Sequence, residues 1–79
     1  MYHVYLLRCA DRSLYTGIAI DPKRRLAEHR QGRGSKYVRS RLPAKLVYQE
    51  KCHSRSAALK REALIKSFSR PQKLALLAH

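Results

Sequence analysis

Residues 2–20 read Y-H-V-Y-L-L-R-C-A-D-R-S-L-Y-T-G-I-A-I, and the fold is specified more clearly here than elsewhere in the chain. The first half, Tyr2–Ala10, is apolar on both faces, which is typical of a central strand covered on two sides. Asp11-Arg12-Ser13 has the composition of a turn. Leu14–Ile20 has the pattern of a second strand, so we expect an antiparallel hairpin.

The alternation of side chains in this hairpin places two tyrosines together. If the turn contains three residues, Cys9 pairs with Tyr15 and Leu7 pairs with Gly17. Successive residues of a strand point to opposite faces, so Tyr5 and Tyr15 then project from the same face. Gly17 lies between them in the pairing and is expected to leave that surface open.

The later segments contain signals for four further elements: a helix, a strand, a second helix and a short final helix. Asp21 and Pro22 are typical of a helix start, and Gly32 is typical of a helix end. The elements expected afterwards are a strand at Lys45–Glu50, a helix from Ser54 to about Ser67 and a short helix from Ser69 to about Ala78. The order β-β-α-β-α-α predicts an α+β fold with a three-stranded antiparallel sheet flanked by helices. We expect one domain over residues 1–79.

The charge balance favours a polyanionic partner. Eighteen Lys and Arg residues face five Asp and Glu residues, which gives a formal net charge of +13. A nucleic acid would relieve the resulting repulsion, and the planar Arg side chain suits phosphate oxygens. The sequence has no long apolar run, signal peptide or lipidation motif. We therefore expect a cytoplasmic protein that binds nucleic acid and no membrane.

Gly32–Pro43 is a basic segment with one aromatic residue, and we expect a loop with a short helical turn. Its cations can bind phosphates, and Tyr37 can stack on an exposed base. Alternatively, Tyr37 and Val38 merely anchor the loop to the core. The residues predicted to contact nucleic acid, from this segment and the first helix, are Arg24, Arg33, Lys36, Tyr37, Arg39 and Arg41.

Two basic side chains of the first helix point in one direction. Arg25 and His29 are four residues apart, so they share a helix face and can pair or share a ligand. Glu28 can form an ion pair with Arg24, which leaves Arg25 without an assigned partner.

Glu62 is the acidic residue with the most informative position. It projects within or beside the buried stripe of its helix, where a carboxylate must be paired or must bind a cation. An ion pair with Lys66, four residues later, is the alternative to a cation site. Spacing alone leaves both interpretations open.

The two cysteines indicate neither a zinc site nor a disulfide. Cys9 lies in an apolar run, and Cys52-His53 has no partner pair at a zinc-ligand spacing. Since there is no secretory signal, we expect both thiols to be reduced.

The positions singled out above resemble the GIY-YIG nuclease family. His3-Val4-Tyr5 and Tyr15-Thr16-Gly17 stand where that family has its two sequence motifs, and Arg25, His29 and Glu62 follow in the family's order. The resemblance covers essentially the whole chain, and it is closest to small stand-alone bacterial members.

Several features are distinctive within this resemblance. Lys36–Pro43 resembles a K-Y-x-R-S-R-L-P stretch of those small members. His3 replaces the Gly of the first motif, and Thr16 replaces the middle Ile of the second. The chain contains no Asn, which some members use late in the domain, and nothing in it resembles the separate DNA-reading domain of larger members.

The resemblance implies a divalent-metal-dependent endonuclease that hydrolyses phosphodiester bonds, with Mg²⁺ or Mn²⁺ held by Glu62. Arg25 would stabilise charge on the phosphate, and Tyr5 is the preferred general base, with its pKa lowered by neighbouring cations. Tyr15 would orient the water or the phosphate, and Gly17 would keep the strand face open. His29 can be a base, an acid or a phosphate ligand.

The implied substrate is DNA in preference to RNA, selected by structure or single-strandedness with little sequence specificity, in DNA repair or recombination. The alternative is a non-catalytic basic nucleic-acid-binding module of the same fold. A basic ribosome-associated protein would leave Tyr5, Tyr15, Arg25, His29 and Glu62 unexplained. A targeting protein partner, the oligomeric state and activity without a partner stay open.

Overall fold

The computed structural model describes residues 1–78 and confirms the α+β class with a three-stranded antiparallel sheet. The short helix α2 (Lys36–Arg39) is the helical turn expected inside the basic segment. The elements in chain order are β1 (Tyr2–Arg8), β2 (Leu14–Ala19), α1 (Pro22–Arg30), α2 (Lys36–Arg39), β3 (Lys45–Cys52), α3 (Arg55–Lys66) and α4 (Arg70–Leu77).

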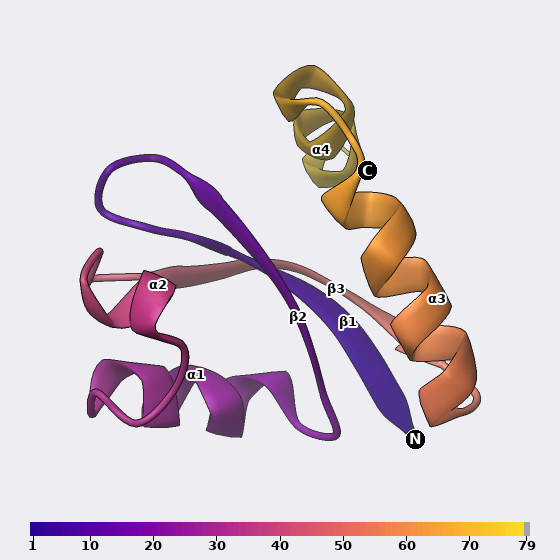
Figure 1. Ribbon diagram of the computed structural model, residues 1–79, viewed down its shortest axis with the longest axis horizontal. Coiled ribbons are helices and arrows are strands. Elements are labelled where there is room, and N and C mark those ends of the chain that lie inside the picture. The colour runs from indigo at the N-terminus through magenta and orange to yellow at the C-terminus, as the bar shows by residue number, and fades with distance from the viewer. Residues whose placement is uncertain (79) are drawn as a thin grey trace.

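β1 is the central strand, since the strand order is β2-β1-β3, and its two faces support separate halves of the core. Tyr5 and Leu7 face a cluster that includes α1 and α2, whereas Val4 and Leu6 face α3 and α4. Figure 1 shows the two pairs of helices on opposite sides of the sheet. The apolar character of both faces of β1 is thereby explained.

The register of the hairpin differs from the expected one by two residues. Tyr5 pairs with Gly17 and Leu7 pairs with Tyr15. The loop does have three residues, but it lies one position earlier than expected, because the Cys9 N–H donates to the Ser13 carbonyl at 2.9 Å. A residue in the left-handed region ends such loops, and Arg12 has a φ of 68°.

Local signals explain the helix boundaries. The Asp21 side chain accepts a hydrogen bond from the Arg24 N–H at the start of α1, and Gly32 has a φ of +79° just beyond its end. Ser54 and Ser69 cap α3 and α4 in the same way. β3 extends past the expected Glu50 to Cys52, because its last residues still pair with the start of β1.

Few of the basic side chains are paired with an acid. Within residues 1–78 the ion pairs are Arg25–Glu28, Arg41–Asp11, Arg61–Glu50 and Lys66–Glu62. The fifth acid, Asp21, is the cap of α1. The acids are thus all engaged, and most of the positive charge stays uncompensated.

In the part of the chain that the structure describes, none of the helices combines the length and apolar composition needed to cross a membrane.

Candidate active site

A cavity of about 350 Å³ lies across β2, which is an edge strand of the sheet. It receives residues from β1, from α1 and the loop after it, and from α3. The lining residues are Tyr5, Tyr15, Gly17, Ile18, Arg25, His29, Arg33, Gly34, Ser35 and Glu62. The structure therefore brings together the six residues expected in or at the catalytic site.

His29 is held by hydrogen bonds at both ring nitrogens. The ring is 2% exposed, its Nδ1 lies 3.1 Å from the Ser35 backbone N, and its Nε2 lies 3.2 Å from the Tyr5 hydroxyl oxygen. A backbone N–H can only donate, so Nδ1 accepts and the ring proton must lie on Nε2. His29 consequently donates its Nε2–H to the Tyr5 oxygen.

This arrangement favours a neutral imidazole. Burial lowers the pKa of His29, and the Arg25 cation lowers it further, while Glu28 opposes both. With Nδ1 occupied by the Ser35 N–H and Nε2 already protonated, the ring has no free site for an incoming proton. Of the three roles open from the sequence, that of general base fits this geometry least.

Tyr5 is 1% exposed, and its environment differs from the one expected. Burial raises the pKa of Tyr5 well above its usual range, and the neighbouring Tyr15 raises it further, while the Arg25 cation lowers it. The expectation of a net lowering of this pKa was therefore wrong, because desolvation of the phenol outweighs the effect of the nearby Arg25 cation. The Tyr5 oxygen accepts from His29, which leaves the phenolic hydrogen available to a ligand in the cavity.

Tyr15 completes an aromatic cluster. The Tyr5 and Tyr15 ring centroids are 6.3 Å apart, which confirms that the two rings share a face of the sheet. The Tyr15 ring meets His29 edge-on at 5.6 Å and stacks on Tyr37 at 6.0 Å. Tyr15 is thus positioned by aromatic neighbours on several sides.

Two glycines allow these rings to approach the backbone. A Cβ atom on Gly17 would lie 2.6 Å from the Tyr5 hydroxyl oxygen, so the Tyr5 ring occupies the space that was expected to be open. A Cβ atom on Gly34 would lie 1.9 Å from His29 Nδ1. Gly34 and Ser35 were not among the residues predicted to form the site, and the repeated Gly in G-R-G-S is the only local signal for them.

Gly34→Ala is expected to displace the His29 ring and break its hydrogen bonds with Ser35 and Tyr5. Overpacking of this kind typically costs about 1–3 kcal/mol. The measurements are urea unfolding and the ¹⁵N chemical shifts of the His29 ring nitrogens. Gly32→Ala is the control: it introduces strain at a positive φ, but its Cβ meets only the Arg39 side chain. Unchanged His29 shifts in Gly34→Ala would contradict this account.

Arg25 forms an ion pair with Glu28 at 3.3 Å, and this finding corrects the expectation that Glu28 pairs with Arg24. The two side chains are 46% and 38% exposed. Exposed pairs of this kind contribute about 0–1 kcal/mol. An anionic ligand in the cavity can therefore compete with Glu28 for the Arg25 guanidinium.

Glu62 forms the ion pair with Lys66 that spacing allowed, and it also lines the cavity. One carboxylate oxygen lies 3.6 Å from Lys66 Nζ. The Glu62 side chain is 18% exposed, compared with 56% for Lys66. The pair is long and its lysine is largely hydrated, so it leaves Glu62 able to accept another cation.

The cavity suits one kind of divalent ion. No group of three or more His, Cys, Asp or Glu residues that could hold a metal occurs among residues 1–78. Mg²⁺ keeps most of its water ligands and often takes a single carboxylate. A lone Glu62 beside a cavity with room for bound waters fits such an ion and does not fit a site built entirely from protein ligands.

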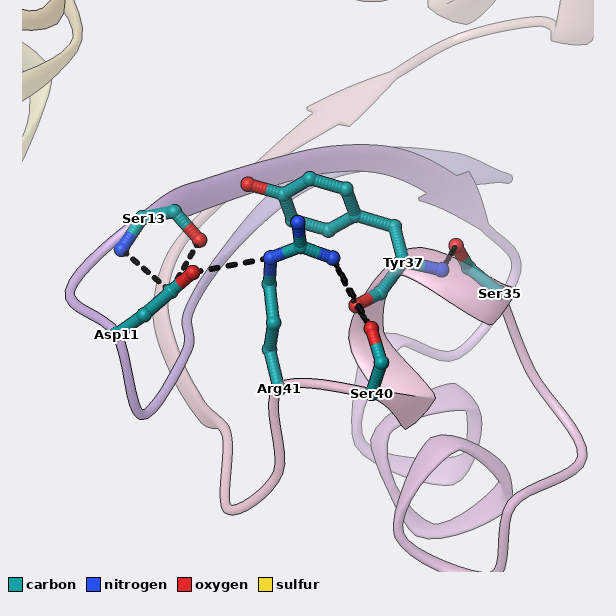
Figure 2. Close-up of polar contacts among 6 residues, drawn as sticks. All are labelled: Asp11, Ser13, Ser35, Tyr37, Ser40 and Arg41. Carbon is teal, nitrogen blue, oxygen red and sulfur yellow. Dashed lines mark hydrogen bonds and ion pairs between the residues drawn. The ribbon is translucent and has the colours of Figure 1, made fainter.

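Arg41 is bound both to Tyr37 and to Asp11 of the hairpin loop (Figure 2). The Arg41 guanidinium lies 3.8 Å above the Tyr37 ring, and its Nε donates to Asp11 at 2.9 Å. It also donates to the Tyr37 carbonyl and to Ser40 Oγ, both at 3.0 Å. Of the two residues that could anchor the segment to the core, Val38 is fully buried, whereas Tyr37 is 39% exposed and its ring lies against Tyr15 and Arg41. The contacts of Arg41 leave it poorly placed to bind a phosphate.

The other residues predicted to contact nucleic acid differ in whether their side chains already have hydrogen-bond partners in the protein. Arg33 lines the cavity and donates to Gln31, and Arg39 donates to the Gly32 carbonyl at 3.3 Å. The side chains of Lys36 and Arg24 have no hydrogen-bond or ion-pair partner within the described range 1–78. Lys36 and Arg24 are therefore the freer cations of the set.

Comparison with known proteins supplies a family relationship. A family model described as the GIY-YIG catalytic domain matches residues 1–75. A UPF0213 protein of Staphylococcus saprophyticus is 48% identical over 98% of this chain and 94% of its own length. A UPF0213 protein of Natronomonas pharaonis is 51% identical over 98% and 91%. The solution NMR structure of a UPF0213 protein from Bacillus halodurans has a TM-score of 0.63 and 39% identity, over 99% of this chain and 84% of that one.

Proposed function

Because this chain belongs to the GIY-YIG nuclease family, we propose that it is a divalent-metal-dependent endonuclease that hydrolyses phosphodiester bonds in DNA. The observation that carries the proposal is the convergence of five side chains on one cavity. They are Tyr5, Tyr15, Arg25, His29 and Glu62. An anionic substrate also fits the net charge of +13.

Hydrolysis of a phosphodiester needs an activated water and stabilisation of the charge that develops on the phosphoryl oxygens. Arg25 would exchange Glu28 for the nonbridging oxygens of the scissile phosphate. Glu62 would hold Mg²⁺ or Mn²⁺, which supplies further positive charge at the developing anion. Tyr15, fixed by its aromatic neighbours, would orient the water or the phosphate.

Tyr5 is the group that would accept the proton of the attacking water. It does so as the phenolate, a form that the Nε2–H bond from His29 and the Arg25 cation both stabilise. Burial opposes that form, so only a small fraction of Tyr5 is in the phenolate form at neutral pH. His29 thus acts as a positioning donor, with its tautomer set by the Ser35 N–H.

The direct test is incubation of the protein with labelled DNA and RNA. The same set of sequences is prepared as single strands, duplexes, flaps and junctions. We expect cleavage with Mg²⁺ or Mn²⁺, none with EDTA, and faster cleavage of single strands and distorted junctions than of perfect duplex. Glu62→Gln protein purified in parallel controls for contaminating nucleases. Binding without cleavage under every condition would favour the non-catalytic module instead.

Selection by shape is expected because we identify no element within residues 1–78 that is suited to reading a DNA groove. Sequence readout requires side chains that reach base edges, and the cations near the cavity are suited to phosphates. A preference for branched DNA would support a role in repair or recombination. Cuts that follow one short sequence through all structures would contradict selection by shape.

Binding is expected to weaken steeply with salt, with log K falling by about 0.9 per duplex phosphate neutralised. Lys36→Ala should reduce the magnitude of this slope by about 0.9, the contribution of one phosphate, because Lys36 is free to bind a phosphate. Arg41→Ala should leave the slope near that of the unchanged protein, because Arg41 is bound to Asp11 and Tyr37. Fluorescence anisotropy at several salt concentrations measures both, and a larger slope change for Arg41→Ala would show that Arg41 contacts phosphate after all.

A further inference from the structure

A second cavity of about 520 Å³ adjoins the first. Ile18 and Arg25 line both cavities, so the two meet along the side chains of these residues. The walls of the second cavity come from the end of β2, the start of α1 and the first residue of α3. Figure 1 shows that these ends of the three elements lie toward the same side of the molecule. The cavity's lining residues are Tyr2, Ile18, Ala19, Ile20, Asp21, Arg24, Arg25, Glu28 and Arg55.

The charges that line this cavity leave two arginines available to a ligand. Arg24 and Arg55 are exposed, and neither guanidinium has a hydrogen-bond or ion-pair partner in residues 1–78. The two acids of the cavity are both engaged, since Asp21 caps α1 and Glu28 pairs with Arg25. A phosphate bound here would therefore meet two unpaired cations from two different helices.

The rest of the cavity wall is apolar. Ile20 is 64% exposed, and Tyr2 and Ile18 are half-buried beside it. A nucleobase presents a flat face that packs on such a wall. The volume lies within the range of about 300–1,000 Å³ that is typical of small-molecule sites.

We infer that this cavity is a subsite for the nucleotide that flanks the scissile phosphate. The phosphate of that nucleotide binds Arg24 and Arg55, and its base packs on Ile20 and Tyr2. The inference rests on the proposed nuclease function. When the scissile phosphate of a nucleic-acid strand binds Arg25, the strand on one side of that phosphate enters the second cavity. The strand on the other side passes residues 33–35. The subsite recognises a phosphodiester-linked nucleotide, so it serves DNA and RNA alike.

The test compares substrates with and without a flanking nucleotide. The variant is Arg24→Gln with Arg55→Gln, and the charge-matched control is Lys60→Gln with Arg70→Gln, whose side chains line neither cavity. The substrates are bis(p-nitrophenyl) phosphate and single-stranded oligonucleotides of three to eight residues, as DNA and as RNA. Circular dichroism verifies that each variant is folded.

For the Arg24/Arg55 variant, the ratio of kcat/KM for oligonucleotide to kcat/KM for the small diester should fall by roughly 100-fold, about tenfold per charge-assisted contact. The control variant should change that ratio by less than about threefold. Equal losses with both substrates, or equal effects of the two variants, would overturn the subsite.

A binding measurement keeps the subsite testable if the protein proves not to be a nuclease. Anisotropy with the same oligonucleotides in EDTA should show the Arg24/Arg55 variant losing affinity and about one phosphate from its salt slope, or roughly 0.7 in log K per log salt for single strands. Ile20→Ala should lower affinity for oligonucleotides without changing that slope. An unchanged slope in the Arg24/Arg55 variant would refute the subsite whether or not cleavage occurs.

Discussion

Glu62→Gln should lower the rate of cleavage by about 10³-fold or more, while the fold and most of the nucleic-acid binding are retained. The amide keeps the size of the side chain but removes its negative charge, and the charge stabilisation supplied by a bound metal ion is worth several kcal/mol. Loss of the Lys66 pair costs little, since the lysine is 56% exposed. Single-turnover cleavage across a Mg²⁺ series, anisotropy and thermal unfolding measure the three properties.

Lys66→Gln is the matched control, because it breaks the same ion pair and leaves the carboxylate in the cavity. We expect it to retain activity within a few-fold of the unchanged protein. If Lys66→Gln and Glu62→Gln lose activity equally, the ion pair and not the metal is the important feature. Full activity of Glu62→Gln would remove the proposed metal site altogether.

Tyr5→Phe should lower the cleavage rate by about 10²–10⁴-fold, the usual contribution of a general base. It should also change the dependence of the rate on pH. The active form of Tyr5 is the deprotonated one, and burial raises the pKa of the phenol. Each unit of pH between about 6 and 9 should therefore increase the rate of the unchanged protein about tenfold, and Tyr5→Phe should lose that increase.

Tyr15→Phe serves as the control for the pH experiment, since it removes a neighbouring hydroxyl but leaves the Tyr5–His29 hydrogen bond in place. Its rate should be lower, with the same slope against pH. Tyr5→Phe leaves the buried His29 Nε2–H without an acceptor, so a loss of about 1–3 kcal/mol of stability is expected beside the catalytic effect. A flat pH profile in the unchanged protein would mean that Tyr5 acts as a neutral hydrogen-bond donor and that another group takes the proton.

The sequence predicted the shared face of Tyr5 and Tyr15 correctly although it predicted the wrong register. The expected pairing was displaced by two residues, and side chains in a strand repeat with a period of two. Faces are therefore unaffected by such a displacement, whereas partners change. The central position of β1 was predictable for a different reason: both of its faces are apolar, as in a strand that is covered on two sides.

Contacts between distant segments could not be predicted in this way. Arg41 and Asp11 are 30 residues apart, and nothing in the composition of either segment indicates that they pair. The contact between the Ser35 N–H and His29 depends on how closely the loop approaches the ring, which Gly34 permits. Burial of Tyr5, and hence the direction of its pKa shift, likewise depends on the packed structure and not on the number of cations in the chain.

The scarcity of ion pairs gives salt two opposite effects on this protein. Four of the 18 basic side chains form ion pairs with acids in residues 1–78, so most positive charges repel one another across a molecule whose longest extent is 28 Å. Dissolved ions screen that repulsion, since the Debye length falls to about 8 Å at physiological ionic strength. The same ions compete with the phosphates of a substrate. The folded protein is therefore expected to be most stable at salt concentrations at which its affinity for a polyanion is lowest. A bound nucleic acid would neutralise the positive charge of the fold in place of added salt.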